Sequence, residues 1–332
     1  MALLLNNIDD LRVYLGRMIN KSFAVDSLVP FISMATDEAI KKAIGTEYHD
    51  RLVTPGATPL SSDELVLKKL VERALAFYSY QKYLPFALGN DGDGGLHEPE
   101  NINTKPLRIG VLEKRQRATA DYAANAIEAV LELLFSDTTI FSEFWETDFG
   151  INLKLKWFRT AAELNELFPQ LNTNYRLLLT LNPYFDTVQN GIVFDTIGAD
   201  IMTQILAYHH NPNPVIPVLT ELKTLYQHVR RFIAYAGYQE ALLFLQVYQT
   251  DKGLRIYSEF DGINNSKAPE AQQWAEYKMK IDTLATSARK TVIGYLNTHA
   301  DIFTDFKNSP LYRTDGKRLP ANQNYKSIFR MR

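Results

Sequence analysis

The sequence contains no cysteine among its 332 residues. Disulfide bonds, thiolate zinc sites, iron–sulfur clusters and cysteine nucleophiles are therefore excluded together. The absence fits an intracellular protein, or one that must survive changes of redox state. Enzymes that depend on a cysteine nucleophile, a thiolate-bound zinc ion or an iron–sulfur cluster are thus excluded.

The chain also lacks a large net charge and a long apolar run. Its 36 Lys and Arg almost balance 38 Asp and Glu, so the net charge is −2 and no strong field attracts it to nucleic acid or to a membrane. No window approaches the roughly 18 continuous apolar residues of a membrane span. The longest candidate, residues 126–135, is interrupted by Glu128 and Glu132, and the N-terminal run is too short for a signal peptide. We expect a soluble protein with no membrane partner.

No motif for nucleotide binding or hydrolytic catalysis occurs. The sequence has no phosphate-binding loop, no Gly-x-Gly-x-x-Gly, no Gly-x-Ser-x-Gly and no His-Glu-x-x-His. Acidic pairs such as Asp9–Asp10 and Asp37–Glu38 stand near expected helix starts, where they complement the helix macrodipole. We therefore predict no enzyme, no catalytic residue and no cofactor. An enzyme with an unfamiliar, acidic site is kept as a third alternative.

Two short polar stretches are candidates for metal sites. Residues 90–95 look like a calcium loop, but counting from Asp91 puts Gly95 at the fifth position, where an oxygen ligand is needed. We favour a polar turn there. His209 and His210 are adjacent, so their side chains point apart, whereas zinc sites place two ligands on one helical face and a third elsewhere. We predict no metal site in the chain.

At about 150 residues per domain the length suggests two domains, and comparison of the chain with itself indicates that they are copies. Residues 73–86 match residues 231–244 at an offset of 158, with six of 14 positions identical where chance gives about one. Three more blocks keep their order along the chain: residues 28–31 with 181–184, 44–47 with 197–200, and 140–144 with 302–306. The first repeat spans roughly residues 1–150 and the second roughly residues 151–306.

The apolar periodicity of both repeats is helical. In the first repeat, Ala124, Ile127, Leu131 and Leu134 recur at the three- and four-residue spacing of an amphipathic helix. Residues 222–233 of the second repeat show the same spacing. We therefore expect helices to form the core of each repeat.

Each repeat is expected to contain a short helix, a second helix that ends at an Ile-Gly element, a long central helix and a long final helix. Strand-like alternation is confined to residues 153–157, which are alternatively the linker between the repeats, and to residues 191–194. Polar, Gly-rich stretches at 89–105 and 253–269 precede the final helices. The predicted fold is all-α, two tandem helical-bundle repeats followed by an extended C-terminal arm.

Tyr80–Gln81 and Tyr238–Gln239 are polar residues that the two repeats share. They could contact a ligand in each unit. The simpler interpretation is that they form hydrogen bonds across a helix interface, because buried polar groups must be paired. We favour this interpretation, since duplicated residues most often preserve the fold.

Residues 307–332 have no counterpart in the first repeat. They carry seven bases and one acid, so this segment has a charge of +6 and the remaining 306 residues carry −8. Aromatic residues are interleaved with the bases, as at protein interfaces. The segment is either a disordered basic end or an extended arm that docks on a neighbouring subunit. The candidate interface residues of the arm are Tyr312, Arg313, Lys317, Arg318, Tyr325, Phe329 and Arg330.

Residues 26–52 begin with an Asp-led helical pattern that has Ala and Ile on one face, and they contain the element Ile-Gly-Thr-Glu-Tyr at 44–48. A long helix of the type of residues 73–86 follows. This stretch resembles the head–tail connector (neck adaptor) proteins of tailed bacteriophages and prophages. The motifs that carry the resemblance are packing motifs.

The resemblance implies small helical bundles in a ring, commonly twelvefold, beneath the portal protein. The implied partners are further copies of the chain, the portal, and tail or other neck proteins, with DNA at most transiently in the lumen. The implied location is the head–tail junction of the virion, after assembly in the host cytoplasm.

Two features depart from the pattern of that family. The adaptor unit occurs twice, and each copy has an extra-long final helix. Six duplicated chains could mimic twelve single units, or twelve chains could form a double-layered ring. The alternative function is that of a non-viral helical-repeat binding protein with a ligand groove between the two units.

Overall fold

The computed structural model describes residues 4–5, 7–19, 24–56, 58–88, 90–92, 95–97, 109–211, 219–245, 247–250, 253–256 and 271–312. These residues are mainly helical, and the chain divides into two compact units. Unit 1 comprises Met1–Glu163 and Thr173–Thr180, and unit 2 comprises Leu164–Asn172 and Leu181–Arg332. The predicted all-α fold with a tandem repeat is confirmed.

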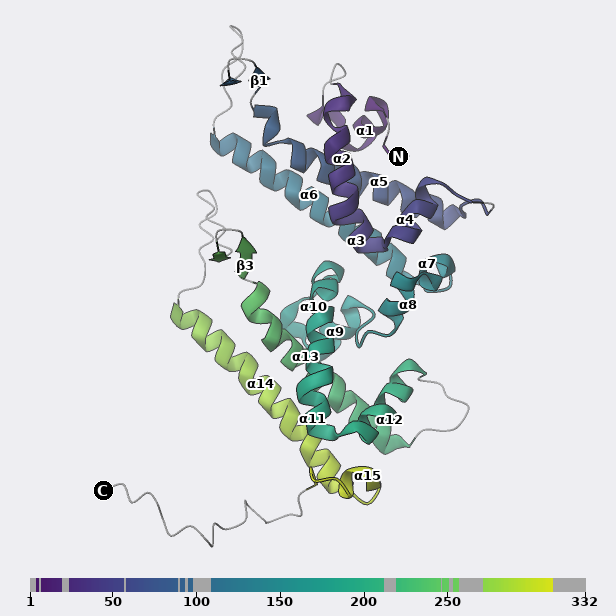
Figure 1. The fold of residues 1–332 in the computed structure, drawn as a ribbon, viewed down its shortest axis with the longest axis vertical. Helices are drawn as coiled ribbons and strands as arrows, with labels where there is room; N and C mark the ends of the chain where they lie inside the picture. The colour runs from purple at the N-terminus through teal and green to yellow at the C-terminus, as the bar shows by residue number, and fades with distance from the viewer. Residues whose placement is uncertain are drawn as a thin grey trace, which may run out of the picture. The chain divides into compact units, whose positions relative to one another are not determined.

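Unit 1 is built on two long helices, α5 and α6, which lie side by side (Figure 1). Shorter helices pack against this pair, and α2 makes the most extensive of these contacts with α5. The helices are α1 (Ile8–Leu15), α2 (Val29–Ala35), α3 (Lys41–Ile44), α4 (Thr46–Val53), α5 (Ser62–Tyr83), α6 (Ile109–Ser136), α7 (Ser142–Glu146) and α8 (Asp148–Lys154). Short 3-10 turns lie at Gly16–Met18, Val25–Ser27 and Phe86–Leu88, and a π-helical turn lies at Thr36–Ile40.

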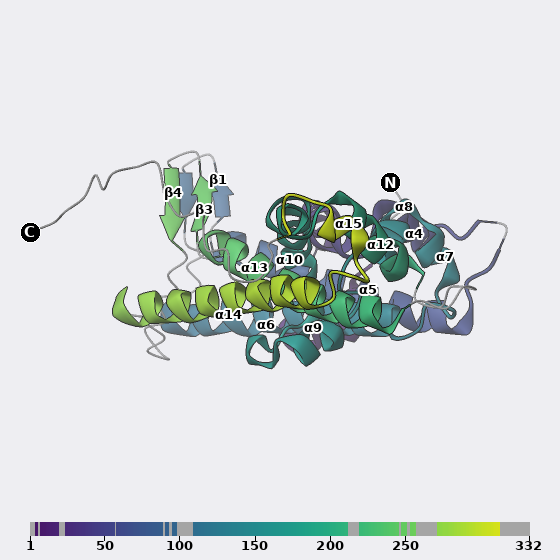
Figure 2. The same cartoon turned by 90° about the horizontal axis from the view of Figure 1, so that it is seen from below.

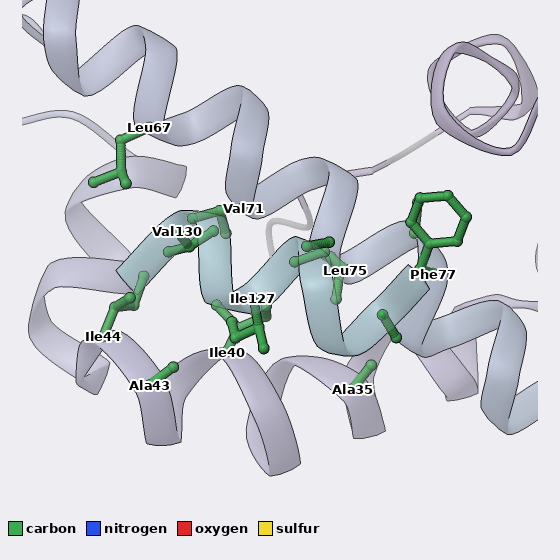
Figure 3. Packing of buried hydrophobic residues seen from close by; sticks show 14 of the residues in the cluster. Ala35, Ile40, Ala43, Ile44, Leu67, Val71, Leu75, Phe77, Ile127 and Val130 are labelled. Carbon is green, nitrogen blue, oxygen red and sulfur yellow. The ribbon is translucent and has the colours of Figure 1, made fainter. Parts of the chain in front are cut away.

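The core of unit 1 lies where α5 meets α6 and the segment from α2 to α3. Leu67, Val71 and Leu75 of α5 are fully buried and project into this region, as Figure 3 shows. Ile127 and Val130 of α6 are buried in the same cluster. Burying one such side chain contributes about 1.5–3 kcal/mol, so the seam between the two long helices is a main source of the unit's stability.

Unit 2 repeats the order of the helices α1 to α7 of unit 1. Its elements are α9 (Ala161–Leu167), α10 (Tyr175–Val188), α11 (Phe194–Ile197), α12 (Ala199–His210), α13 (Thr220–Leu245), α14 (Ala271–Thr298) and α15 (Thr304–Lys307), with a 3-10 turn at Pro169–Leu171 and a π-helical turn at Gln189–Val193. The first residues of α9 and of α10 belong to unit 1. The long helices α13 and α14 lie side by side (Figure 2).

The correspondence extends to a rare feature. The two π-helical turns occupy equivalent positions at an offset of 153, and α6 and α14 are equivalent over their full length at an offset of 162. Because π-helical turns are uncommon, their recurrence at one place supports descent of both units from one ancestral bundle.

Neither predicted strand segment is a strand. Leu153 and Lys154 end α8 and the chain then turns toward Trp157, while residues 191–194 belong to the π-helical turn and α11. Leu153, Trp157 and Val193 are buried in the helical core, whereas Leu155, Ile192 and Phe194 are exposed. Alternation over four or five residues does not separate a strand from a short helical segment.

The described residues of each unit include a small hairpin, which lies between the two long helices in the sequence. Strand β1 (Asn90–Gly92) pairs with β2 (Gly95–His97), and β3 (Val247–Thr250) pairs with β4 (Gly253–Ile256), both antiparallel. In each hairpin two residues of the sequence separate the partners of the last pair, Gly92 with Gly95 and Thr250 with Gly253. The Gly-rich stretches were expected only as polar connections, so these hairpins are an addition to the predicted fold.

Candidate functional site

Among the candidate arm residues, Tyr312 is the one that the structure describes. Arg313, Lys317, Arg318, Tyr325, Phe329 and Arg330 lie outside the described residues. Tyr312 packs edge to face on Phe306 of α15, with ring centroids 6.1 Å apart. The start of the basic segment therefore belongs to the packed surface of unit 2.

This start repeats a turn at the end of unit 1. The Thr147 hydroxyl donates to the Phe144 carbonyl at 2.6 Å, and the Ser309 hydroxyl donates to the Phe306 carbonyl at 2.7 Å. The two pairs are equivalent at the offset of 162 that relates α6 to α14. The expectation that the whole basic segment lacks a counterpart is therefore wrong for its first residues, up to Tyr312.

A pair of aromatic rings occupies the same surface position in each unit. Phe31 lies 5.2 Å from Phe86 in unit 1, and Tyr184 stacks 5.9 Å from Phe244 in unit 2, measured between ring centroids. Phe86 is 66% exposed and Phe244 is 58% exposed. Core packing does not require an aromatic ring that faces solvent, so its retention in both copies points to a contact made by the surface.

The shared tyrosines join the two long helices of each unit. The Tyr80 hydroxyl accepts a hydrogen bond from Arg115 of α6, and the Tyr238 hydroxyl lies 2.9 Å from that of Tyr277 of α14. Arg115 and Tyr277 are themselves equivalent at an offset of 162. Burial raises the pKa of both Tyr80 and Tyr238, so both stay protonated at neutral pH. Their interpretation as helix-interface residues is confirmed.

The neighbouring glutamines differ between the units. Gln239 donates from its amide to Asp282 of α14 at 2.9 Å. The residue equivalent to Asp282 is Ala120, which has no acceptor, so Gln81 of unit 1 does not repeat this bond. The Gln position therefore contributes to the helix interface in unit 2.

An ionic cluster in unit 1 ties three helices together. Arg51 of α4 donates to Glu64 of α5 at 3.0 and 3.2 Å, and it also pairs with Glu143 of α7. Burial alone would raise the pKa of Glu64, but hydrogen bonds from Arg51 and from a backbone N–H outweigh it and hold that pKa below its usual value. In unit 2, Gln204 donates to Asp305 at 3.1 Å in the equivalent place. The cluster is a clamp between helices.

The sequence candidates for metal ligands have other surroundings. His209 is buried, and its Nδ1 lies 2.8 Å from the Tyr226 hydroxyl. Asp91 lies in β1, paired with Leu96 of β2. Within the described part of the chain, no group of three or more His, Asp or Glu side chains is arranged to hold a metal ion.

A pocket of about 280 Å³ opens on unit 2 between α11, α14 and α15. On one side, Arg289 of α14 donates from Nε to the Thr196 hydroxyl at 3.1 Å. On the other, the Oδ1 atom of Asn297 is buried and has no hydrogen-bond partner among the described residues. Phe306 and Leu311 give the pocket an apolar wall.

The equivalent corner of unit 1 is closed. Where α14 has Arg289, Ile293 and Asn297, α6 has Ile127, Leu131 and Phe135, which are 3%, 1% and 6% exposed. We did not predict this difference between the repeats from the sequence. Its signal is a polar residue in one repeat at a position where the other repeat has an apolar one.

The closed corner of unit 1 is covered by the segment Thr173–Thr180. The Tyr175 ring lies 5.1 Å from that of Phe135, and the Glu128 carboxylate of α6 accepts hydrogen bonds from the backbone N–H groups of Tyr175 and Arg176 at 2.6 and 3.3 Å. Leu179 packs against the same core cluster. Unit 1 is thus completed by a segment that carries the start of α10.

Seven helices of unit 1, α1 to α7, recur in the same order in unit 2 as α9 to α15, which defines a tandemly duplicated all-α protein. The chain belongs to a family of unknown function, DUF6712, whose model matches residues 32–150 and again residues 171–316. Each match corresponds to one repeat. No curated protein and no solved structure matches the chain. No helix in the described residues is long and apolar enough to cross a membrane.

Proposed function

We propose that this protein is a structural component of the virion of a tailed phage or prophage. Its role is that of a head–tail connector, a neck ring component that joins the portal to the tail. The observation that carries the proposal is the aromatic pair Phe31–Phe86 or Tyr184–Phe244, present once in each unit with its second ring, Phe86 or Phe244, exposed. Closed rings satisfy repeated, heterologous contacts, and a surface contact duplicated within one chain suits such an assembly.

The partners follow from the resemblance of residues 26–52 to neck adaptors. They are further copies of the chain in a ring, twelvefold as in that family, together with the portal and with tail or other neck proteins. DNA passes the lumen at most transiently. The site of action is the head–tail junction, after assembly in the host cytoplasm.

The distribution of charge also supports an assembly role. Residues 307–332 carry +6 and the rest of the chain carries −8. Opposite charges on separate parts of one chain favour head-to-tail contacts between copies, because the basic part of one copy meets the acidic part of the next.

The exposed aromatic pairs provide the test. The double variant Phe86→Ser/Phe244→Ser is compared with Val13→Ser/Met279→Ser, whose side chains are also exposed, at 76% and 66%, but form no such pair. Light scattering after size exclusion measures the mass of each assembly. We expect the mass of an oligomer for the wild type and the control, and a lower mass for the aromatic double variant. A wild-type chain that stays monomeric at all concentrations and binds no portal or neck protein would refute it.

A further inference from the structure

We propose that the surface around Phe86 in unit 1 of one copy docks on the surface around Phe244 in unit 2 of a second copy of this chain. The inference rests on the proposed function, because it names the contact that joins neighbouring copies in the assembly. The two aromatic surfaces then bind each other, and the charges beside the two rings select this pairing.

The surface in unit 1 combines an exposed ring with charged side chains of two elements. Phe86 is 66% exposed and packs on the partly buried ring of Phe31 in α2. Four residues before Phe86, Lys82 of α5 forms an ion pair with Glu38 of the π-helical turn that follows α2. The side chains of this pair are 39% and 47% exposed. The ring and the charges therefore lie on one surface, formed by the end of α5 and the segment that begins with α2.

The same surface in unit 2 keeps the ring and changes the charge. Phe244 is 58% exposed and stacks on Tyr184, the equivalent of Phe31. Glu240, which is exposed, occupies the position of Lys82. It stands four residues before Phe244 within α13, so the two side chains lie on one face of that helix. An acid thus stands beside the ring of unit 2 where unit 1 has a base.

The reversal of charge extends to the neighbouring positions. Lys82 first, and Lys42 to a smaller extent, lower the pKa of Glu38, so both bases lie close to this carboxylate. In unit 2 the position of Lys42 is Asp195. Five aligned positions carry a net +1 in unit 1 and −2 in unit 2: Asp37, Glu38, Lys41, Lys42 and Lys82 align with Asn190, Gly191, Phe194, Asp195 and Glu240. The sum in unit 2 stays negative when Arg289, which lines a pocket together with Asp195, is included.

Charge therefore selects which surfaces meet. Approach of the two rings brings their neighbouring charged groups together, so two unit 1 surfaces would oppose Lys82 to Lys82, and two unit 2 surfaces would oppose Glu240 to Glu240. One surface of each kind brings base to acid. The ion pair of Lys82 with Glu38 does not prevent this contact, because exposed ion pairs are weak and an ammonium group has three donors.

This pairing also explains how a contact between two surfaces produces a ring. Each copy uses unit 1 toward one neighbour and unit 2 toward the other, so the contact is heterologous. An unused surface remains at each end of an open chain of copies until the two ends meet. The exposed rings of Phe86 and Phe244 lose their contact with water at every such junction.

Charge reversal in separate chains tests the pairing. Lys82→Glu places two acids at the contact, and Glu240→Lys places two bases there, so each variant should self-associate about tenfold or more weakly than the wild type. An equimolar mixture of the two variants should assemble again, because the two reversed surfaces attract each other and so do the two unchanged ones. The double variant Lys82→Glu/Glu240→Lys should also assemble.

Light scattering after size exclusion measures the mass of each species, and an affinity tag on one variant should retain the other from the mixture. Lys69→Glu is the matched control. It makes the same change of charge at an exposed position earlier in α5, and it should assemble like the wild type. Circular dichroism should be the same for all variants.

Loss of assembly in both single variants without recovery in the mixture would overturn the pairing, because the two surfaces would then not bind each other. An assembly that neither reversal weakens would overturn it as well, while the connector proposal stands. So would a wild-type chain that binds a portal or neck protein but is monomeric by itself. A wild-type chain that neither assembles nor binds such a protein would refute both proposals.

Discussion

At the scale of single residues, two glycines set the geometry of the repeat. Gly45 separates α3 from α4 with φ +78°, and Gly198 separates α11 from α12 with φ +84°. With ψ of 156° and 164°, both lie in a backbone region that is essentially restricted to glycine. A Cβ on Gly45 would lie 2.9 Å from the Cβ of Phe149, whereas one on Gly198 would lie 3.6 Å from Leu311. The two sites share their strain and differ in the space around them.

Substitution of these glycines is therefore expected to destabilise unequally. Gly198→Ala should cost about 1–3 kcal/mol through the backbone alone, and Gly45→Ala should cost more because the new methyl group overlaps Phe149. Urea unfolding measures both. Gly294→Ala is the control: this glycine lies inside α14 with open space around it, so alanine should stabilise by about 0.5–1 kcal/mol. Equal stability of Gly45→Ala and wild type would contradict this account of the Ile-Gly element.

At the scale of elements, the clamp of Arg51, Glu64 and Glu143 makes unit 1 sensitive to acid. The pKa of Glu64 is lower in the folded protein than its ordinary value of about 4.3. The carboxylate therefore contributes stability above the unfolded pKa, and this contribution is lost as the pH falls through the lower, folded pKa.

The variant Glu64→Gln should be less stable than wild type by about 1–3 kcal/mol at neutral pH, because Arg51 loses a charged partner in a buried place. The difference should shrink as the pH falls below about 4, where wild type also loses the charge. Urea unfolding followed by tryptophan fluorescence, to which Trp145 of the neighbouring α7 contributes, measures it. Glu47→Gln, at an exposed position of α4, should change stability by less than about 0.5 kcal/mol. A difference that grows on acidification would argue against the clamp.

The helices were predictable because their signal is strong and local. Ile127, Leu131 and Leu134 follow one face of a helix, and all three are buried. The hairpins were missed because strands of three or four residues carry too little alternation to register. The sequence of the first hairpin did carry a signal, since Asp93-Gly94 between its paired residues is typical of a two-residue hairpin loop, whereas the second hairpin has Asp251-Lys252 there.

The candidate site was predicted only in part. The basic arm is visible in composition, and Tyr312 is the one candidate interface residue of the arm that the structure describes. The exposure of Phe86 and Phe244 could not be predicted, because an aromatic residue at helical spacing suggests core. Prediction of the pocket would have required an alignment of the two final helices, α6 and α14. The polar residue Arg289 stands out only when it is compared with Ile127, its equivalent in the first repeat. Long-range pairing of this kind is not encoded in local patterns.

At the scale of the whole molecule, duplication links the fold to the proposed role. Each unit offers the same exposed aromatic pair, while the corners at α6 and α14 have diverged into a closed apolar one and an open polar one. A chain that presents the same surface twice, and an open corner in one unit alone, is suited to self-association into open filaments or closed rings. Closure into a ring limits the assembly to a fixed number of copies.

The central claim is that this chain forms a closed ring at the head–tail junction, and native mass spectrometry of the full chain tests it most directly. The predicted result is a single dominant species whose mass is a fixed multiple of 37.9 kDa. This species should appear as a ring in negative stain and should bind a portal protein. A monomer at all concentrations tested, or a continuous series of open multimers without portal binding, would contradict it.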